Sequence, residues 1–314
     1  MIELFEETAE LFRATHASFP HFFTGFFFVL GAFVGSFLNV CIFRIPAGES
    51  IVFPGSHCDC GKPIPFYLNV PIVSWLILRG RAACCGRKIS LRHPCVELFT
   101  ALVFAAVWQF LPAGAVAPAI AFCAFGIVLA FIDWDTMLLP DSVNALFVVA
   151  GLACGAAFPQ ALGAETFGEG IWRAAVGLGV GSLVVFWFRF FASVILRREA
   201  MGEGDVILLG GIGAFLGWRG AIFSFFFSAF VGLAAFGIVK IFSRERVAKS
   251  ERAREASLLS CEGDEDGAEL FASGAGTPFP LGPWLLISGA VYLFFQDEIL
   301  ALAEKFFRGE ISLF

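Results

Sequence analysis

The chain has 314 residues, of which 58% are hydrophobic and 15% charged, and its mean hydropathy is +0.83. Soluble domains contain about a quarter charged residues, so this composition excludes a water-soluble globular protein of ordinary type. The net charge of −6 and the pI of about 5.3 argue against nucleic-acid binding. The composition predicts an all-α integral membrane protein.

The first 21 residues combine acidic side chains with apolar ones at helical spacing, which predicts an interfacial amphipathic helix over 1–21. The acidic start has no basic region ahead of an apolar stretch, so we expect no cleavable signal peptide.

About 20 apolar residues are needed for a helix to cross the bilayer. Seven segments meet this requirement: 22–43, 95–111, 115–132, 142–159, 171–196, 220–242 and 280–296. An eighth segment, 206–217, is short and glycine-rich, and it either crosses a thinned region or re-enters the membrane. We therefore predict about eight transmembrane helices.

The non-membrane parts complete the predicted organisation. A loop domain over 44–94 separates the first span, 22–43, from a helical core over 95–242. A basic run followed by an acidic one predicts a flexible loop over 243–278, and 279–314 holds the last span with a C-terminal tail.

Lys and Arg indicate the orientation, because they concentrate in cytoplasmic loops. With eight spans and the N-terminus outside, fifteen basic residues lie inside and five outside, and seven of the fifteen fall between 44 and 93. The loop 44–94 is therefore predicted to be cytoplasmic, and so is the end of the bundle next to it.

Two aspartates stand at the cytoplasmic ends of apolar segments, where a carboxylate is costly without a function. Asp133 directly continues the run 115–132, and Asp205 opens the short segment 206–217. Two carboxylates from different helices share a proton, and such a pair can activate water and protonate a leaving amine. This is the chemistry of an aspartyl protease.

Neighbouring aspartates fit that role less well. Asp135 lies about 200° around a helix from Asp133, so the two cannot face one site. Asp141 follows Pro140 before an apolar span, a position typical of a helix N-cap. We therefore predict Asp133 and Asp205 as the catalytic pair.

The chain resembles the type IV prepilin peptidases, a family of membrane aspartyl proteases of the GxGD type. The matching stretches are GAFVGSFLNVCIFRIP (31–46), NVPIVSWLILRGR (69–81), CCGRKISLRHPCVELFTALVF (84–104), IDWDTMLLPDSVN (132–144), GEGDVILLGGIGAFLG (202–217) and PFPLGPWLLISGA (278–290). The family's two catalytic aspartates fall on Asp133 and Asp205.

The resemblance implies a function in type IV pilus assembly or type II secretion. Family members cleave the short basic leader of prepilins and pseudopilins after Gly, at the cytoplasmic face of the bacterial inner membrane. Many then methylate the new N-terminus with S-adenosylmethionine, and by that resemblance Glu49 and Ser50 are weak candidates for the methylation site. The implied partners are these substrates and the lipid bilayer.

The cysteine-containing loop departs from the family pattern. Many members carry two Cys-x-x-Cys pairs, a spacing that suits one tetrahedral zinc ion. Here Cys58 and Cys60 are separated by one residue, and Cys84 and Cys85 are adjacent. Zinc bound by Cys58 or His57 together with Cys60, Cys84 and Cys85 is one hypothesis, although adjacent cysteines suit a tetrahedral ion poorly. The alternative is a loop with free thiols, because cytoplasmic cysteines stay reduced.

Other polar residues support weaker hypotheses. Asn39 fits a polar contact between helices or with a substrate, and Glu97 fits a contact with the basic loop or a helix cap. Arg189 is close enough to the end of its span for its side chain to reach the membrane interface, which is a simpler interpretation than a catalytic role. Cys41, Cys123 and Cys154 are expected to be core residues.

The leading prediction is therefore a bifunctional prepilin peptidase and N-methyltransferase. One alternative keeps the peptidase without the methylation. The other is a transporter or scaffold with Asp133 and Asp205 as an ion site, but the acids of a transporter belong near the midplane of the membrane.

Overall fold

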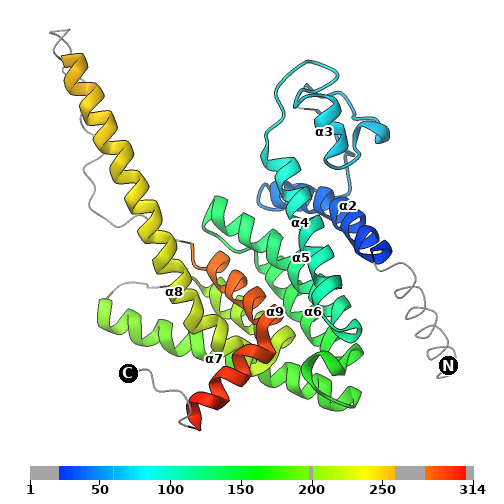
Figure 1. The fold of residues 1–314 in the computed structure, drawn as a ribbon, viewed down its shortest axis with the longest axis vertical. Helices are drawn as coiled ribbons and strands as arrows, with labels where there is room; N and C mark the ends of the chain where they lie inside the picture. Colours follow the sequence, from blue (N-terminus) through cyan, green and yellow to red (C-terminus); the bar gives the residue numbers. More distant parts are fainter. Residues whose placement is uncertain (1–20, 59, 198–200, 259–279, 309–314) are drawn as a thin grey trace.

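The computed structural model describes residues 21–58, 60–197, 201–258 and 280–308. Apart from two isolated β-bridges, the regular structure of these residues is helical (Figure 1). The elements are α2 (Phe22–Arg44), η1 (Phe66–Leu68), α3 (Val73–Ile77), α4 (Arg92–Phe110), α5 (Ala113–Thr136), α6 (Asp141–Ala157), η2 (Pro159–Leu162), α7 (Phe167–Leu196), α8 (Glu203–Leu258) and α9 (Gly282–Phe307). The predicted interfacial helix falls almost entirely outside the described residues.

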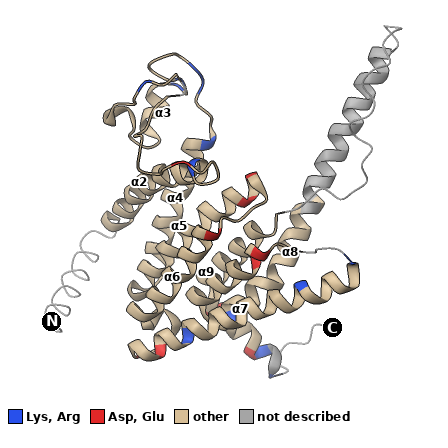
Figure 2. Cartoon of the chain, turned by 180° about the vertical axis from the view of Figure 1, so that it is seen from behind, with Lys and Arg blue, Asp and Glu red and all other residues tan. Residues whose placement is uncertain are grey.

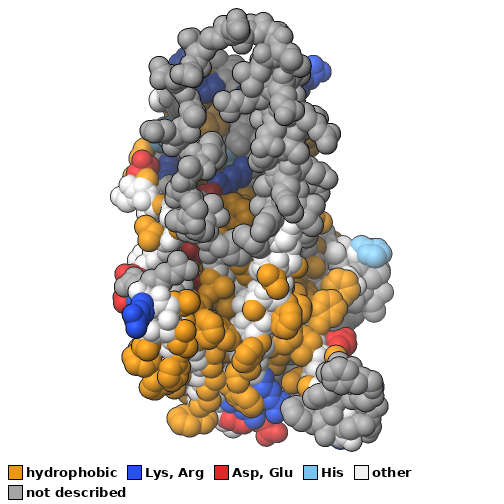
Figure 3. All heavy atoms as spheres, turned by 90° about the vertical axis from the view of Figure 1, so that its left-hand side faces the viewer, with side chains coloured by type: hydrophobic (Ala, Val, Ile, Leu, Met, Phe, Trp, Pro, Cys, Tyr) orange, Lys and Arg blue, Asp and Glu red, His pale blue; other side chains and the backbone are white. Residues whose placement is uncertain are grey.

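Six of these helices, α2, α4, α5, α7, α8 and α9, are long and apolar enough to cross a membrane. The 17-residue α6 is apolar and covers about 26 Å, slightly less than a bilayer core. Charged residues gather mainly near helix ends and in the loop around α3 (Figure 2), and one flank of the bundle is almost continuously hydrophobic (Figure 3). The chain is an all-α, multi-pass membrane protein, as predicted.

The long helix α8 is two helices joined by a reversal at Gly217, whose φ of 73° and ψ of 175° are not helical. A Cβ placed on Gly213 would lie 3.2 Å from the Cβ of Ala221, a distance that a straight helix cannot give to residues eight apart. Residues 203–216 therefore run antiparallel to the helix that follows.

The short predicted segment 206–217 crosses the bundle and does not re-enter. Its turn residue, Gly217, lies beside Leu162 in η2, at the opposite end from Asp205. The first arm of α8 has 14 residues and spans only about 21 Å. Neighbouring helices surround this short arm, and Leu208, Leu209 and Ile212 are fully buried.

Helix α7 packs on this first arm through backbone contacts at two glycines. A Cβ on Gly177 would lie 2.0 Å from the carbonyl oxygen of Gly213, and one on Gly181 would lie 2.4 Å from that of Leu209. Small residues allow such close approach, which favours helix association in membranes. The antiparallel register extends to Arg189, which faces Glu203 at the start of α8.

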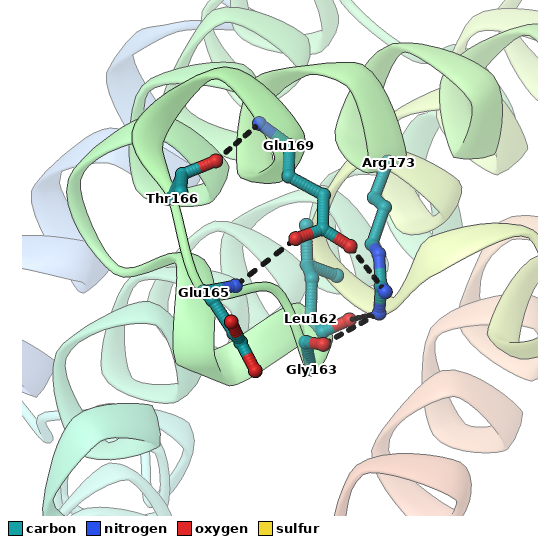
Figure 4. Close-up of polar contacts among 6 residues, drawn as sticks. All are labelled: Leu162, Gly163, Glu165, Thr166, Glu169 and Arg173. Carbon is teal, nitrogen blue, oxygen red and sulfur yellow. Dashed lines mark hydrogen bonds and ion pairs between the residues drawn. The ribbon is translucent and has the colours of Figure 1, made fainter.

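The turn before α7 is held by a compact polar network (Figure 4). The Thr166 hydroxyl caps α7 by accepting the backbone N–H of Glu169 at 3.2 Å. The Arg173 guanidinium pairs with the Glu169 carboxylate and donates to the carbonyls of Leu162 and Gly163 at 2.8 and 2.7 Å. This network lies at the end of α6 and α7 remote from Asp133 and Asp205, and it has no direct part in their chemistry.

Three expectations about segment boundaries need correction. The predicted flexible loop 243–278 is wrong in its first part, since α8 stays helical to Leu258, and 259–278 lie outside the described residues. Ala, Arg, Glu and Lys, which favour helices, dominate 244–255. Asp141 is the first residue of α6, whose cap is Pro140, so Asp141 is not the N-cap. Finally, α4 begins at Arg92 and not at 95.

The α7–α8 contact gives a test of this fold. Gly181→Leu should lower stability by about 1–3 kcal/mol or more, because the side chain would meet backbone atoms of α8. Gly179→Leu is the matched control, since a Cβ there meets nothing within 4 Å. Thermal unfolding in detergent measures the difference. Equal melting temperatures for the two variants would contradict the close α7–α8 packing.

Candidate active site

Asp133 lies in the last turn of α5 and is buried, with 5% of its surface exposed. Its Oδ2 accepts a hydrogen bond of 3.0 Å from the backbone N–H of Gly282, the first residue of α9. A Cβ at residue 282 would lie 2.6 Å from this oxygen, so any larger residue there would displace the Asp133 carboxylate. The last helix of the chain thus supplies the polar partner of Asp133.

Asp205 lies in the first turn of α8 and is also buried, at 8% exposure. The backbone of Gly202 hydrogen-bonds to its carboxylate, and the two carboxylates of Asp133 and Asp205 interact electrostatically. Leu208, one turn further along α8, lies against the same Gly282 that contacts Asp133. The end of α5, the beginning of α8 and the beginning of α9 therefore meet, and they bring the two predicted aspartates together.

The GEGD turn itself is held by α6. Asn144 Nδ2 donates a hydrogen bond of 3.1 Å to the carbonyl oxygen of Gly204. A Cβ on Gly204 would lie 2.9 Å from the Cβ of Leu139, in the short connection between α5 and α6. The segment after Asp133 and the segment before Asp205 are consequently in direct contact.

Arg189 is not explained by a reach to the interface alone. Its Nη2 lies 3.2 Å from the Glu203 carboxylate, and its charge interacts with Asp205. The α7–α8 register produces this position, because the row of α7 residues that faces α8 continues from Gly181 through buried Val185 to Arg189. A cation thus lies near Asp205, and its place there could not be predicted from the sequence.

The neighbouring aspartates point elsewhere. Asp135 faces away from Asp133, as predicted from the helical angle, and pairs with Arg92 of α4. Asp141 is exposed. The sequence also did not identify Gly282 and Asn144 as partners of the site. The only available signal was that both lie in stretches that resemble the family.

The four loop cysteines gather in one cluster. Their sulfur atoms all lie within 4.8 Å of one another, with Cys58–Cys85 at 3.6 Å and Cys60–Cys84 at 3.4 Å. Sulfurs of a tetrahedral zinc site lie about 3.8 Å apart. The donor set therefore fits zinc, although Cys84 and Cys85 are adjacent.

Two tight turns make this geometry possible. In the first, Cys58 N–H donates to the Lys62 carbonyl, and Gly61 has φ of 83°. In the second, Ala82 N–H donates to the Arg87 carbonyl, and Gly86 has φ of 69°. His57 is not part of the sulfur cluster, and its Nδ1 lies 3.1 Å from the Gly55 carbonyl.

The thiols of the cluster differ in acidity. Hydrogen bonds from the Lys62 backbone and from Cys84 lower the pKa of Cys60 to about 7, whereas the hydrogen bond with Cys60 raises the pKa of Cys84 to about 12. Thiolates are the metal-binding form, and neighbouring thiolates repel one another. Full ionisation of the cluster therefore requires a cation.

The loop domain is attached to the bundle through Glu97 and Asn39. Glu97 accepts a 2.7 Å hydrogen bond from the N–H of Ile72, a non-glycine residue with φ of 63°. Asn39 Nδ2 donates to the His93 carbonyl at 3.1 Å, which is a contact between α2 and α4. Glu97 thus contacts the loop, one of the two predicted roles, and Asn39 joins two helices.

Glu49 and Ser50 lie in the turn after α2 and are exposed. The Ser50 hydroxyl accepts the backbone N–H groups of Val52 and Phe53 at 3.3 and 3.2 Å, and its carbonyl accepts from Arg44. Ser50 therefore shapes its own turn, whereas the Glu49 carboxylate is accessible to a ligand.

The comparisons with known proteins cover most of the chain. Residues 29–110 match the bacterial peptidase A24 N-terminal domain, and residues 120–237 match the type IV leader peptidase family. A prepilin leader peptidase/N-methyltransferase of Myxococcus xanthus is 35% identical over 88% of this chain and 92% of its own length.

Two further relatives carry the same name. The Klebsiella pneumoniae protein is 34% identical over 65% of this chain and 89% of its own length, and the Stutzerimonas stutzeri protein is 31% identical over 89% and 93%. No solved structure gives a significant match.

Proposed function

Because this chain belongs to the family of prepilin leader peptidases/N-methyltransferases, we propose that it removes the basic leader of type IV prepilins and pseudopilins after Gly, with Asp133 and Asp205 as the catalytic pair. The observation that carries this proposal is that α5, α8 and α9 converge through Gly282 at one end of the bundle, where two buried carboxylates lie close enough to interact electrostatically. Gly282 lies against Asp133 and Gly202 against Asp205, and their missing side chains let the backbone approach the two carboxylates closely.

The chemistry follows from two carboxyl groups that share one proton. The ionised member removes a proton from water, which attacks the carbonyl carbon of the scissile peptide bond. The protonated member hydrogen-bonds to the carbonyl oxygen, and the pair then returns a proton to the leaving amine. Burial excludes bulk water and strengthens these interactions.

A transporter or scaffold is the less favoured reading. Asp133 lies in the last turn of α5 and Asp205 in the first turn of α8, so neither lies near the middle of a span. A position at helix ends suits a substrate that approaches from the membrane surface better than an ion that crosses at the midplane.

The substitution of either aspartate tests the catalytic pair. Asp133→Asn and Asp205→Asn should each lower cleavage of a prepilin by more than about 100-fold, because an amide cannot act as a base. Asp141→Asn is the control, since this residue is exposed and lies outside the pair. Mass spectrometry of the products measures leader removal, and methylation of an already cleaved substrate verifies that the variants are folded. Near-normal cleavage by either variant would refute the assignment.

We further propose that the loop 44–94 contributes to methylation of the new N-terminus, with S-adenosylmethionine as the methyl donor. The accessible Glu49 carboxylate is the better of the two candidates for contact with that donor, because Ser50 is engaged within its turn. In this proposal Cys58, Cys60, Cys84 and Cys85 hold zinc, which supplies a structural crosslink between two turns of the loop.

The zinc proposal predicts that purified protein contains about one zinc per chain. The double substitution Cys60→Ser and Cys85→Ser should release the metal and reduce methylation more than cleavage, because the aspartates lie on other segments. Cys95→Ser is the control, since Cys95 is exposed and outside the cluster. Elemental analysis gives the zinc content, and one preparation is assayed for both reactions. Metal-free protein that still methylates would show that the loop folds without zinc.

We also propose that the protein lies in the bacterial inner membrane, with its N-terminus outside and the aspartates and the loop 44–94 on the cytoplasmic side. The excess of basic residues at that end supports this orientation.

A thiol reagent that cannot cross the membrane tests the orientation. In intact cells it should not label Cys58, Cys60, Cys84 or Cys85, and labelling should require permeabilisation together with a chelator. An engineered Gln160→Cys, at the exposed position of η2 at the opposite end, should react in intact cells and serves as the positive control. Labelling of the four native cysteines from outside would reverse the orientation.

A further inference from the structure

Arg92, the first residue of α4, lies where three helices meet. Its guanidinium donates two hydrogen bonds to the Asp135 carboxylate on α5, one of them 3.0 Å long between Nη1 and Oδ1. The Cζ atom also lies 5.2 Å from the ring centroid of Phe43 on α2 and 5.1 Å from that of Phe131 on α5. One side chain thus connects α2, α4 and α5.

This arrangement is more than a surface ion pair. Exposed ion pairs contribute little because both side chains are mobile and solvated. Here the side chains of Arg92 and Asp135 are only 29% and 33% exposed, and the two-pronged geometry fixes their mutual orientation. The two aromatic rings restrict the guanidinium further through cation–π contacts.

The connection joins the two matched parts of the chain. Helix α4 and most of α2 lie within residues 29–110, whereas most of α5 falls within residues 120–237. Helix α5 contacts α2 and α4 as well as α6 and α9. Arg92 makes its ion pair at the end of α5 that carries Asp133.

Asp133 and Asp135 occupy the same final turn of α5 and face opposite directions. The last turn of a helix lacks part of its hydrogen bonding and is prone to open. Arg92 holds this turn through Asp135 on one face, and Gly282 holds it through Asp133 on the other. If Arg92 is lost, the turn keeps only one of these attachments.

We propose that Arg92 is a positioning residue for the cleavage reaction, which holds the last turn of α5 through Asp135 so that Asp133 stays aligned with Asp205. The inference rests on the proposed function, because it concerns the alignment of that catalytic pair. Arg92 touches neither the substrate nor the reacting atoms in this role.

The test compares kinetics of Arg92→Met, Arg92→Lys and a control, Lys88→Met, which removes the same charge from the loop side. Arg92→Met should lower kcat for prepilin cleavage about tenfold, since small misplacements of a catalytic group are costly. KM should stay close to the wild-type value. The kcat of Arg92→Lys should lie between those of Arg92→Met and the wild type, because lysine keeps the charge and loses the two-pronged contact. Lys88→Met should behave as wild type.

A charge exchange and a second reaction separate positioning from general damage. The double variant Arg92→Asp with Asp135→Arg should recover part of the kcat that each single substitution removes. Methylation of an already cleaved substrate should remain near wild type in Arg92→Met. Equal loss of both reactions, or a kcat for Arg92→Met within experimental error of wild type, would overturn the inference.

The outcome for Asp133→Asn identifies which idea fails. If Asp133→Asn still cleaves, the catalytic pair itself is wrong. If Asp133→Asn is inactive while Arg92→Met cleaves normally, the pair stands and only the positioning role of Arg92 is refuted.

Discussion

Two carboxylates buried at the edge of a membrane impose the central constraint on this structure. Each is costly to place in an apolar environment, and together they repel one another unless they share a proton. Both costs are smallest where helices end, since water and unpaired backbone groups are available there. Asp133 lies at the end of α5 and Asp205 at the beginning of α8. The end of α5 and the beginnings of α8 and α9 must therefore lie at the same level for the pair to form.

The close contact of α7 with α8 helps to meet that constraint. Backbone contacts at Gly177 and Gly181 set the antiparallel register, and the same register places Arg189 opposite Glu203, beside Asp205. The 14-residue first arm of α8 reaches the far end of the bundle, and the reversal at Gly217 lets the following helix return. The close contact at the two glycines, together with the hydrogen bond from Asn144 to Gly204, determines where the first turn of α8 lies. The position of Asp205 thus depends partly on contacts one to two turns further along α8.

The sequence was informative wherever one physical property dominates. Apolar length predicted the helices, and the helical angle between Asp133 and Asp135 correctly separated a buried residue from an outward one. Partners that depend on the arrangement of distant segments could not be predicted in this way. The N–H of Gly282 reaches Asp133 across 149 residues, and Arg189 approaches Glu203 only because of the α7–α8 register.

Local spacing was also a poor guide to the cysteine cluster. Adjacent Cys84 and Cys85 suggested an unfavourable ligand set, yet the turn at Gly86 brings both sulfurs toward Cys58 and Cys60. A backbone that reverses within a few residues can turn neighbouring side chains toward one point, which regular helix or strand geometry would forbid. The spacing of ligands in a sequence therefore constrains a metal site only when the intervening backbone conformation is known.

The two matched parts of the chain have different physical requirements, and α5 is where these requirements meet. The proposed cleavage pair needs a dry, tightly fixed environment, which the buried residues of α5 and of the first arm of α8 provide. The cysteine-containing loop is largely exposed and has few helical residues, so its conformation depends on local turns and on attachments such as Glu97 to Ile72. Arg92 begins the helix that leads from the loop into the membrane and binds the turn that carries Asp133. A change at Arg92 can therefore reach the turn that carries Asp133 by a short path.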